Sequence, residues 1–414
     1  MKNRVVVTGY GAVTPIGNNT DEFWNALKNN KCGIDRISRF DTTSFNTKLS
    51  AEVKDFDMNN FSIREQKNLP LHTCYAISAT KEAIKMSSIE NNIENPYRFG
   101  VIIGSAIGGI GTIEEEHKKL IEDLTPRHVS PYLIPKVLVD SVASNISILI
   151  NAKGYCMSCT SACSSSNTSI GEAYRQIKYG YQDIMICGGA ESPITPLSVA
   201  GFEKMRAMST SININRASIP FDAERNGFVI GEGSGILLLE NLEYAKKRKA
   251  KIYAEIVGYG FTSDAYHIVR PNIDGEPQAQ AMQFAIDESG ISIDEIKYIN
   301  AHGTGTVIND ETETLAIKKV FGKNTDVKIS STKSFIGHLM GAAGSVELIA
   351  TIMAMNNNYI LPTINYKLKD EKCDLNYVAN EGLKQKYDFA LSNSFGFGGK
   401  NTSILVKKWS EDYV

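Results

Sequence analysis

The sequence of 414 residues has no long apolar run and no strong excess of charge of either sign. No stretch approaches the roughly 18 apolar residues needed to span a bilayer. The first residues run into an expected strand at residues 4–8, and they lack the apolar length and small-residue cleavage site of a signal peptide. A formal net charge of −2 gives no electrostatic reason to bind nucleic acid or an anionic membrane. We therefore expect neither as a partner.

Cysteine is also scarce, with seven residues at irregular spacings. An odd number without a framework favours free thiols in a reducing cytoplasm over disulfides. Cys156 and Cys159 have the spacing of half a zinc site, but there is no second such pair and the six histidines are scattered. We expect no metal. The glycine-rich segment 104–111 lacks the spacing of a dinucleotide or phosphate loop, so no nucleotide cofactor is expected either.

What is present is an ordinary globular composition, with 42% hydrophobic and 22% charged residues. Strand patterns alternate with helical patterns, and a second series of elements beginning near residue 251 matches the first in order. We expect an α/β protein with buried, mostly parallel sheets, built from two similar halves, residues 1–250 and 251–414. The segment 340–356 is apolar all round, which predicts a helix lying between sheets.

The segment 160–166, Thr-Ser-Ala-Cys-Ser-Ser-Ser, predicts a strand-to-helix turn that presents a thiol. Cys163 would lie at the first turn of a helix over residues 167–179, where unpaired backbone N–H groups favour the thiolate. A lone cysteine is more often a buried structural residue. Here two glycine-flanked histidines, His302 and His338, supply partners for a nucleophile. An enzyme is therefore the working hypothesis.

Six short motifs follow one another along the chain, at residues 6–9, 161–163, 226–233, 300–306, 333–344 and 393–399. In this order and spacing they resemble the β-ketoacyl-acyl-carrier-protein synthases of the thiolase superfamily over essentially the whole chain. The resemblance implies a duplicated, five-layer αβαβα fold and a dimer. It also implies carbon–carbon bond formation between thioesters carried on acyl carrier protein, with no metal, nicotinamide or flavin cofactor.

The resemblance assigns the catalytic roles to four residues. Cys163 is the nucleophile that becomes an acyl-enzyme. The backbone N–H groups of Cys163 and Phe397 form the oxyanion hole, and Phe397 is also the gating phenylalanine. His302 and His338 donate ring N–H groups to the enolate oxygen left when a malonyl-type extender loses carbon dioxide.

Four further residues are expected to support this site. The resemblance pairs Lys333 with Glu347 beneath the histidines, so we interpret Lys333 as a positioning residue with catalytic consequences. Asp310 and Glu313 could be mistaken for an acid–base pair of carboxylates. Because a helix follows them, we interpret them as cap and structural charges.

Substrate contacts are predicted at five positions. Thr304 and Thr306 have hydroxyl groups suited to the amides of a phosphopantetheine arm, although loop threonines can also simply stabilise a turn. Ile107, Leu133 and Phe395 are expected along the acyl chain.

Three basic residues, Arg64, Lys67 and Arg206, are expected to dock an acidic carrier protein. The remaining four histidines are expected at the surface or in dimer contacts: His72, His117, His128 and His267.

Three departures from the family pattern bear on the pathway. Ser-Ser-Ser at residues 164–166 is a form more familiar from polyketide ketosynthases than from housekeeping enzymes. Leu133 stands where phenylalanine is common, which leaves room for a longer or bulkier chain, and Lys400 places a charge near the gate. These departures favour a type II polyketide or polyene ketosynthase. A housekeeping fatty-acid elongation synthase is the alternative.

Related activities are less compatible with the sequence. A thiolase needs a second catalytic cysteine in a Cys-x-Gly motif, but Asp374 and Leu375 follow Cys373. The initiating synthases have an asparagine where this chain has His338. Non-catalytic chain-length-factor subunits lose the nucleophile, which is present here as Cys163. The dimer partner can still be a second copy or such a homologue.

Overall fold

Ten strands form one mixed sheet in the computed structural model, which describes residues 2–90 and 92–410. The strands of the first half are β1 (Val5–Val13), β4 (Phe99–Gly104), β5 (Cys156–Cys159), β6 (Ile184–Glu191) and β7 (Gly233–Asn241). Those of the second half are β8 (Ala254–Ser263), β9 (Ile296–Asn300), β10 (Lys328–Ser330), β13 (Phe389–Gly396) and β14 (Lys400–Lys408). Two short pairs lie outside this sheet: β2 (Asp35–Arg36) with β3 (Leu49–Ser50), and β11 (Tyr359–Ile360) with β12 (Leu383–Lys384).

The strand order repeats between the halves. The spatial order is β5-β4-β6-β7-β1 in the first half and β10-β9-β13-β14-β8 in the second. Within each half, the strands can be numbered one to five in chain order. From the outer edge of the sheet inward, their order is then three, two, four, five, one in both halves. In both, the second strand pairs in parallel with its two neighbours, whereas the fifth strand is antiparallel to both of its own. The predicted repeat of elements is therefore present in the topology.

The expectation of a mostly parallel sheet was wrong. Each half combines two parallel with two antiparallel pairings, and the halves join through a short antiparallel pairing of β1 with β8. In the second half, the physical reason is the connection into the fifth strand. β14 follows β13 by a tight turn, which can join only antiparallel strands.

Helices cover and separate the two halves. They are α1 (Thr20–Lys28), α2 (Ile63–Asn68), α3 (Leu71–Ser87), α4 (Ile110–Asp123), α5 (Leu133–Val137), α6 (Ser141–Ile150), α7 (Ser165–Lys178), α8 (Pro196–Lys204), α9 (Leu242–Lys247), α10 (Glu276–Ser289), α11 (Val307–Phe321), α12 (Lys333–Ile336) and α13 (Ala343–Asn356). Helices α3 and α6 pack on the first five strands, and α10 packs on β8 and β14 with α11 beside it. Helices α7 and α13 contact strands of both halves. This arrangement gives five layers, helix–strand–helix–strand–helix.

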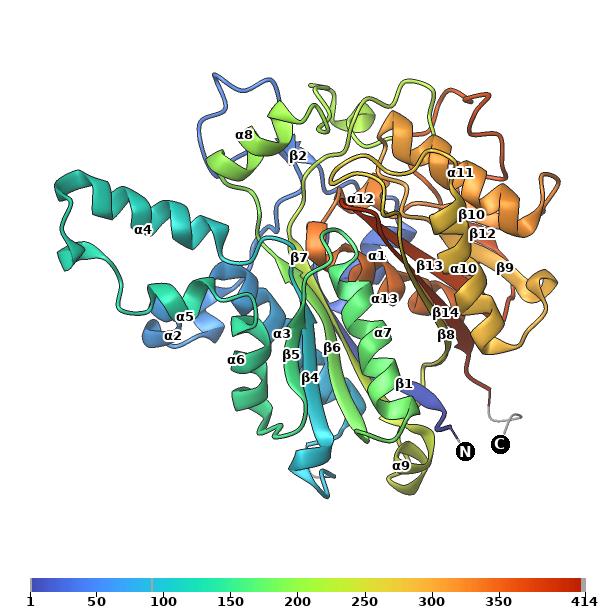
Figure 1. The fold of residues 1–414 in the computed structure, drawn as a ribbon, viewed down its shortest axis with the longest axis horizontal. Helices are drawn as coiled ribbons and strands as arrows, with labels where there is room; N and C mark the ends of the chain where they lie inside the picture. The colour runs from blue at the N-terminus through green and yellow to red at the C-terminus, as the bar shows by residue number, and fades with distance from the viewer. Residues whose placement is uncertain (1, 91, 411–414) are drawn as a thin grey trace.

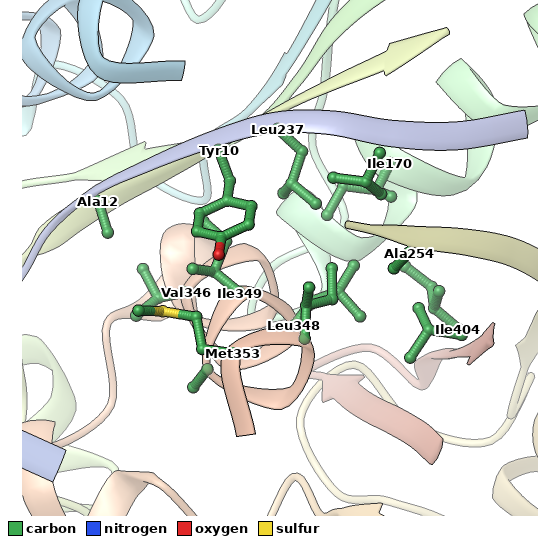
Figure 2. Packing of buried hydrophobic residues seen from close by; sticks show 14 of the residues in the cluster. Tyr10, Ala12, Ile170, Leu237, Ala254, Val346, Leu348, Ile349, Met353 and Ile404 are labelled. Carbon is green, nitrogen blue, oxygen red and sulfur yellow. The ribbon is translucent and has the colours of Figure 1, made fainter. Parts of the chain in front are cut away.

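Helix α13 is the centre of the molecule, as its apolar sequence predicted. Every residue of it from Ala343 to Met355 is buried. Figure 2 shows Val346, Ile349 and Met353 of this helix beneath Tyr10 of β1, with residues of β7, β8 and β14 close by. One hydrophobic cluster therefore spans both halves, and the boundary at residue 250 stays a prediction about domains.

Pro70 separates α2 from α3 because its ring cannot continue the first helix. In addition, α4 and α5 project to one side of the sheet (Figure 1), beside the edge strand β5. No helix in the described ranges is long and apolar enough to cross a membrane.

Candidate active site

A cavity of about 350 Å³ collects residues from both halves of the chain. The predicted residues that line it are Cys163, Arg206, His302, Thr304, Thr306, Glu313, His338, Phe395 and Phe397. Glu313 comes from α11 and Phe395 from β13, and the others come from loops between elements. The structure thus brings together a thiol and two imidazoles that are separated by up to 175 positions in the sequence.

Cys163 sits on a tight turn between β5 and α7. Ala162 adopts a left-handed backbone with φ of +53°, which is unusual for a residue other than glycine. A strained turn of this kind exposes a nucleophile at the start of a helix. The helix itself begins at Ser165 with Ser164 as its cap, so Cys163 precedes the first turn instead of lying in it. Ser394 Oγ donates a hydrogen bond to the carbonyl of Cys163 at 3.0 Å and ties the turn to β13.

The expected stabilisation of the Cys163 thiolate was wrong in its net direction. Burial raises the pKa of this thiol to about 11, whereas the backbone N–H of Phe397 and the charge of Lys333 lower it. Desolvation exceeds the favourable contributions. The two N–H groups that act on the sulfur, those of Phe397 and of Cys163 itself, are the pair predicted for the oxyanion hole.

The two histidines are buried and neutral at pH 7. Burial and the nearby Lys333 hold the pKa of His302 and of His338 well below the usual value. Their rings lie 5.4 Å apart between centroids, nearly perpendicular at 85°. The backbone N–H of Met340 donates to Nδ1 of His338 at 3.3 Å. The proton of His338 is therefore on Nε2, which is buried with no partner among the described residues.

Carboxylates hold the loop of His302 in place. Glu313 accepts hydrogen bonds from the backbone N–H groups of His302 and Gly303, both at 2.8 Å. Asp310 accepts from the N–H of Gly305 at 3.2 Å and of Phe221 at 2.8 Å. Both carboxylates accept hydrogen bonds from backbone N–H groups, which is the geometry expected of residues that support the structure.

Lys333 and Glu347 pair below the cavity. Nζ of Lys333 lies 2.5 Å from Oε1 of Glu347, and both side chains are almost completely buried. Neither residue lines the cavity. Burial raises the pKa of Glu347 to about 7, although Lys333 opposes the rise.

Of the five predicted substrate residues, three line the cavity and two do not. Thr304 and Thr306 share a hydroxyl–hydroxyl hydrogen bond of 2.9 Å at the cavity wall, and the ring of Phe395 lies 5.8 Å from that of His302. Ile107 and Leu133 do not line the cavity. Leu133 begins α5 in the projecting region, and Ile107 lies in the loop after β4.

The basic residues differ in whether they line the cavity. Arg206 is exposed at the cavity, whereas Arg64 and Lys67 are exposed on α2, which does not line it. Lys400 begins β14 opposite Gly396 and does not line the cavity either.

Of the other histidines, His117, His128 and His267 are exposed as expected. His72 was expected at the surface or in dimer contacts but is buried, because it lies on α3 where the helix packs inward.

Comparison with known proteins decides the family. A family model named "Beta-ketoacyl synthase, N-terminal domain" matches residues 2–245, and its C-terminal counterpart matches residues 253–367. The chain belongs to the β-ketoacyl synthase family. It is therefore a condensing acyltransferase with a thiolase-like fold, and the predicted five-layer architecture is confirmed.

Full-length relatives carry the same assignment. The 3-oxoacyl-[acyl-carrier-protein] synthase 2 of Staphylococcus aureus (strain COL) is 44% identical, with 98% of each chain covered. A protein of the same name from Synechocystis sp. is also 44% identical, with 99% of each covered. The chain thus matches these synthases from end to end.

Solved structures of synthases have the same fold. A β-ketoacyl synthase from Burkholderia phymatum STM815 superposes with a TM-score of 0.91 at 34% identity, covering 99% of this chain and 100% of that one. A chain from the complex of a type II PKS acyl-carrier protein with its ketosynthase bound to the hexaketide has a TM-score of 0.91 at 33% identity and the same coverage. A chain of the ishigamide ketosynthase/chain length factor has a TM-score of 0.93 at 30% identity, again with the same coverage.

The structure also adds residues to the site of this β-ketoacyl synthase that the sequence did not single out. The ring of Phe228 lies 5.4 Å from that of His338, and Phe202 lies 6.5 Å from the ring of Phe397. Met340 has a left-handed backbone, which turns its N–H toward His338. Phe228 lies within one of the six motifs, but its contact with His338 joins residues that are 110 positions apart. No local spacing in the sequence predicts such a contact.

Two features of the described residues bear on the alternative chemistries. Cys373, the candidate second cysteine of a thiolase, is buried in the cluster of the C-terminal half and does not line the cavity. Within residues 2–90 and 92–410, no group of three or more histidine, cysteine, aspartate or glutamate side chains could hold a metal ion.

Proposed function

We propose that this chain is a 3-oxoacyl-acyl-carrier-protein synthase that extends an acyl chain by decarboxylative condensation with malonyl-acyl-carrier protein. The observation that carries the proposal is the joint position of Cys163, His302 and His338 in one cavity, within a chain that matches such synthases over its full length. A non-catalytic member of the family would not need all three.

The first step is acyl transfer to Cys163. Cys163 reacts as its thiolate, which is the minor form at neutral pH because burial raises the pKa of the thiol. The thiolate attacks the thioester carbonyl, and the tetrahedral oxyanion is stabilised by the N–H groups of Cys163 and Phe397. Collapse of this intermediate expels the carrier thiolate and leaves an acyl-enzyme. Phe397 lies between Gly396 and Gly398, the latter with φ of +76°, so its backbone can move as the arm enters.

The second step forms the carbon–carbon bond. Loss of carbon dioxide from the malonyl thioester puts negative charge on its carbonyl oxygen as an enolate. Nε2–H of His338 is free to donate to that oxygen, and a ring N–H of neutral His302 is its second donor. The enolate carbon then attacks the acyl–Cys163 carbonyl, the Cys163 thiolate leaves, and a 3-oxoacyl thioester remains on the carrier. The charge of Lys333, below the cavity, acts on Cys163, His302 and His338 and helps to position them.

The carrier protein and a second synthase chain are the proposed partners. The phosphopantetheine arm, which belongs to the carrier, would reach the cavity past Thr304 and Thr306, with Arg206 meeting acidic carrier groups. No further cofactor is required by these steps, and the proposed location is the cytoplasm. Ile107 and Leu133 would contact the acyl chain where it extends beyond the cavity.

The proposed dimer uses the surface around β5. Strand β5 is one edge of the central sheet, and exposed apolar residues gather on it and on α4 to α6. Examples are Ile134, Leu138, Ile148 and Met157. An unpaired edge with apolar neighbours is a surface that a second chain can cover. The partner is a second copy or a chain-length-factor-like homologue.

Reconstitution with labelled extender tests the proposal. The purified chain would be incubated with acyl-carrier protein and malonyl-carrier protein that carries ¹³C in the free carboxyl group. The proposal predicts equal amounts of ¹³CO₂ and 3-oxoacyl-carrier protein. Carbon dioxide without condensed product, or condensation that retains the label, would refute it.

The pathway is proposed as type II polyketide or polyene synthesis. Ser-Ser-Ser at residues 164–166 and Leu133 support it, together with the likeness to solved polyketide ketosynthases. The second candidate is housekeeping fatty-acid elongation, which the 44% identity to the Staphylococcus aureus synthase favours. Competition between a saturated acyl-carrier protein and a polyene or poly-β-keto acyl-carrier protein separates them. Preference for the saturated chain would support the fatty-acid role.

A further inference from the structure

Glu191 is a buried carboxylate with no role in the chemistry described above. It is the last residue of β6 and is completely buried. No ion pair involves it among the described residues. Its two oxygens instead accept four hydrogen bonds, and these come from two separate segments of the chain. A charge desolvated in this way is costly unless it is hydrogen-bonded, so the contacts specify where both segments lie.

The first segment is the loop that follows β4. Oε1 of Glu191 accepts from Ser105 Oγ at 2.9 Å and from the N–H of Ile107 at 3.4 Å. Oε2 accepts from the N–H of Ala106 at 2.6 Å. Ser105 Oγ also accepts from the N–H of Gly108 at 3.1 Å, which closes the loop.

The second segment is the turn that follows His338. Oε2 of Glu191 accepts from the N–H of Gly341 at 3.1 Å. The preceding residue, Met340, is the one whose N–H donates to Nδ1 of His338. A single peptide unit therefore separates the hydrogen bond to Glu191 from the hydrogen bond that sets the tautomer of the imidazole.

The two segments are packed without spare room. A Cβ added to Gly341 would lie 2.4 Å from the backbone nitrogen of Ala106 and 2.5 Å from Oε2 of Glu191, closer than real Cβ contacts. Met340 holds a left-handed backbone, with φ of +50°, that a methionine does not favour. Something must stabilise that turn, and the carboxylate of Glu191 accepts a hydrogen bond from its Gly341 N–H.

We propose that Glu191 is a positioning residue for His338, holding the turn at residues 340–341 so that Nε2–H of the imidazole points at the enolate oxygen. This inference rests on the proposed function, since it presumes that His338 stabilises the enolate. The turn that carries Cys163 is tied instead to β13 through Ser394, although the charge of Glu191 also acts to raise the pKa of the Cys163 thiol.

Three variants test the assignment. Glu191→Ala removes every hydrogen bond, including the one from Gly341. Glu191→Gln keeps an oxygen for Ala106 and Gly341, while its amide can donate to the hydroxyl of Ser105. Ser105→Ala removes one bond to Glu191 and leaves the Gly341 bond intact. Two rates would be measured separately: acyl loading of Cys163 by intact mass, and decarboxylation of malonyl-carrier protein.

We expect Glu191→Ala to slow decarboxylation about tenfold or more while loading stays within about threefold of wild type. Glu191→Gln and Ser105→Ala should both retain near-wild-type decarboxylation. The ¹⁵N chemical shift of His338 Nδ1 should move in Glu191→Ala and not in Ser105→Ala. Equal loss of both rates in Glu191→Ala, or an unchanged decarboxylation rate, would overturn the inference.

A folding failure of Glu191→Ala does not block the test. Glu191→Asp keeps the charge but shortens the side chain by one methylene group, so it cannot reach both segments. It should show the same separation of the two rates, and an equal loss in both would count against the inference. Failure of the proposed function would look different, because the wild-type chain itself would then release no carbon dioxide coupled to condensation.

Discussion

Nζ of Lys333 and Oε1 of Glu347 lie 2.5 Å apart, and each side chain is only 1% exposed. The lysine comes from α12 and the glutamate from α13, on either side of His338. The charge of Lys333 lowers the pKa of the Cys163 thiol and of both histidines. Burial keeps the imidazoles neutral, as hydrogen-bond donors, and this buried cation adds to that effect while it opposes the rise in the pKa of the thiol.

The first prediction removes that cation. In Lys333→Met the pKa of Cys163 should rise, because the opposing charge is lost while burial remains. Alkylation of Cys163 requires the thiolate, so its rate at pH 8 should fall by roughly tenfold for each ~1.4 kcal/mol of lost stabilisation. The rate should also begin to level off only at a pH above about 11, the wild-type value. Peptide mapping after iodoacetamide treatment measures it.

A matched variant separates charge from folding in that experiment. Lys333→Met strands the carboxyl of Glu347, which costs on the order of 3 kcal/mol of stability when a buried pair is broken. The double variant Lys333→Met with Glu347→Gln removes the stranded group. It should regain stability and keep the slow alkylation. If the double variant regained wild-type alkylation, the charge of Lys333 would not be acting on the thiol.

The second prediction concerns the two histidines. In His302→Ala and His338→Ala, decarboxylation of malonyl-carrier protein should fall about 100-fold, the usual loss for one donor at a developing oxyanion. Loading of Cys163 should fall less, because its oxyanion hole is built from backbone groups. His72→Phe is the control, since His72 is buried but lies outside the cavity. Loading impaired as strongly as decarboxylation would argue against the assigned roles.

The third prediction tests carrier docking. Arg206→Glu at the cavity should weaken carrier binding by about fivefold or more, and Arg64→Glu and Lys67→Glu on α2 should add to it. Wild-type affinity should fall as salt is raised, since exposed charges are screened. Lys247→Glu on α9, at the other end of the molecule in Figure 1, is the control and should bind normally. Calorimetric affinities that do not depend on salt would contradict electrostatic docking.

The fourth prediction tests the edge of the sheet. Ile148 on α6 is 80% exposed beside β5, and Ile268 near the cavity is 81% exposed. If the surface around β5 is the dimer interface, Ile148→Asp should shift the chain toward the monomer in analytical ultracentrifugation. Ile268→Asp, equally exposed, should leave the association unchanged. The same shift in both variants would mean that the effect is not specific to this surface.

Much of the site could be predicted because its residues lie in short segments with recognisable spacing. Cys163, His302, His338 and Phe397 each sit beside glycine or small residues, and all four line one cavity. The repeat of the two halves could be read from the order of strands and helices, since local patterns indicate each element. The apolar helix α13 was placed between sheets for the same reason.

What could not be predicted depends on contacts between distant segments. The pKa of Cys163 was misjudged because the helix start is a local feature, whereas burial comes from the whole fold. The hydrogen bonds of Glu191 join residues up to 150 positions apart. His72 was misplaced because the inward face of α3 is settled only by packing. The antiparallel pairings of the sheet depend on how the strands are connected, and patterns of hydrophobicity do not indicate those connections.

The central claim is that Cys163 carries the acyl group, and one measurement tests it most directly. Intact mass spectrometry after incubation with acyl-carrier protein should show one acyl group on the wild-type chain. Cys373→Ala, which removes a buried cysteine outside the cavity, should show the same adduct. Cys163→Ala should remain folded, show no adduct and catalyse no condensation. An acyl adduct or unaltered condensation in Cys163→Ala would contradict the account.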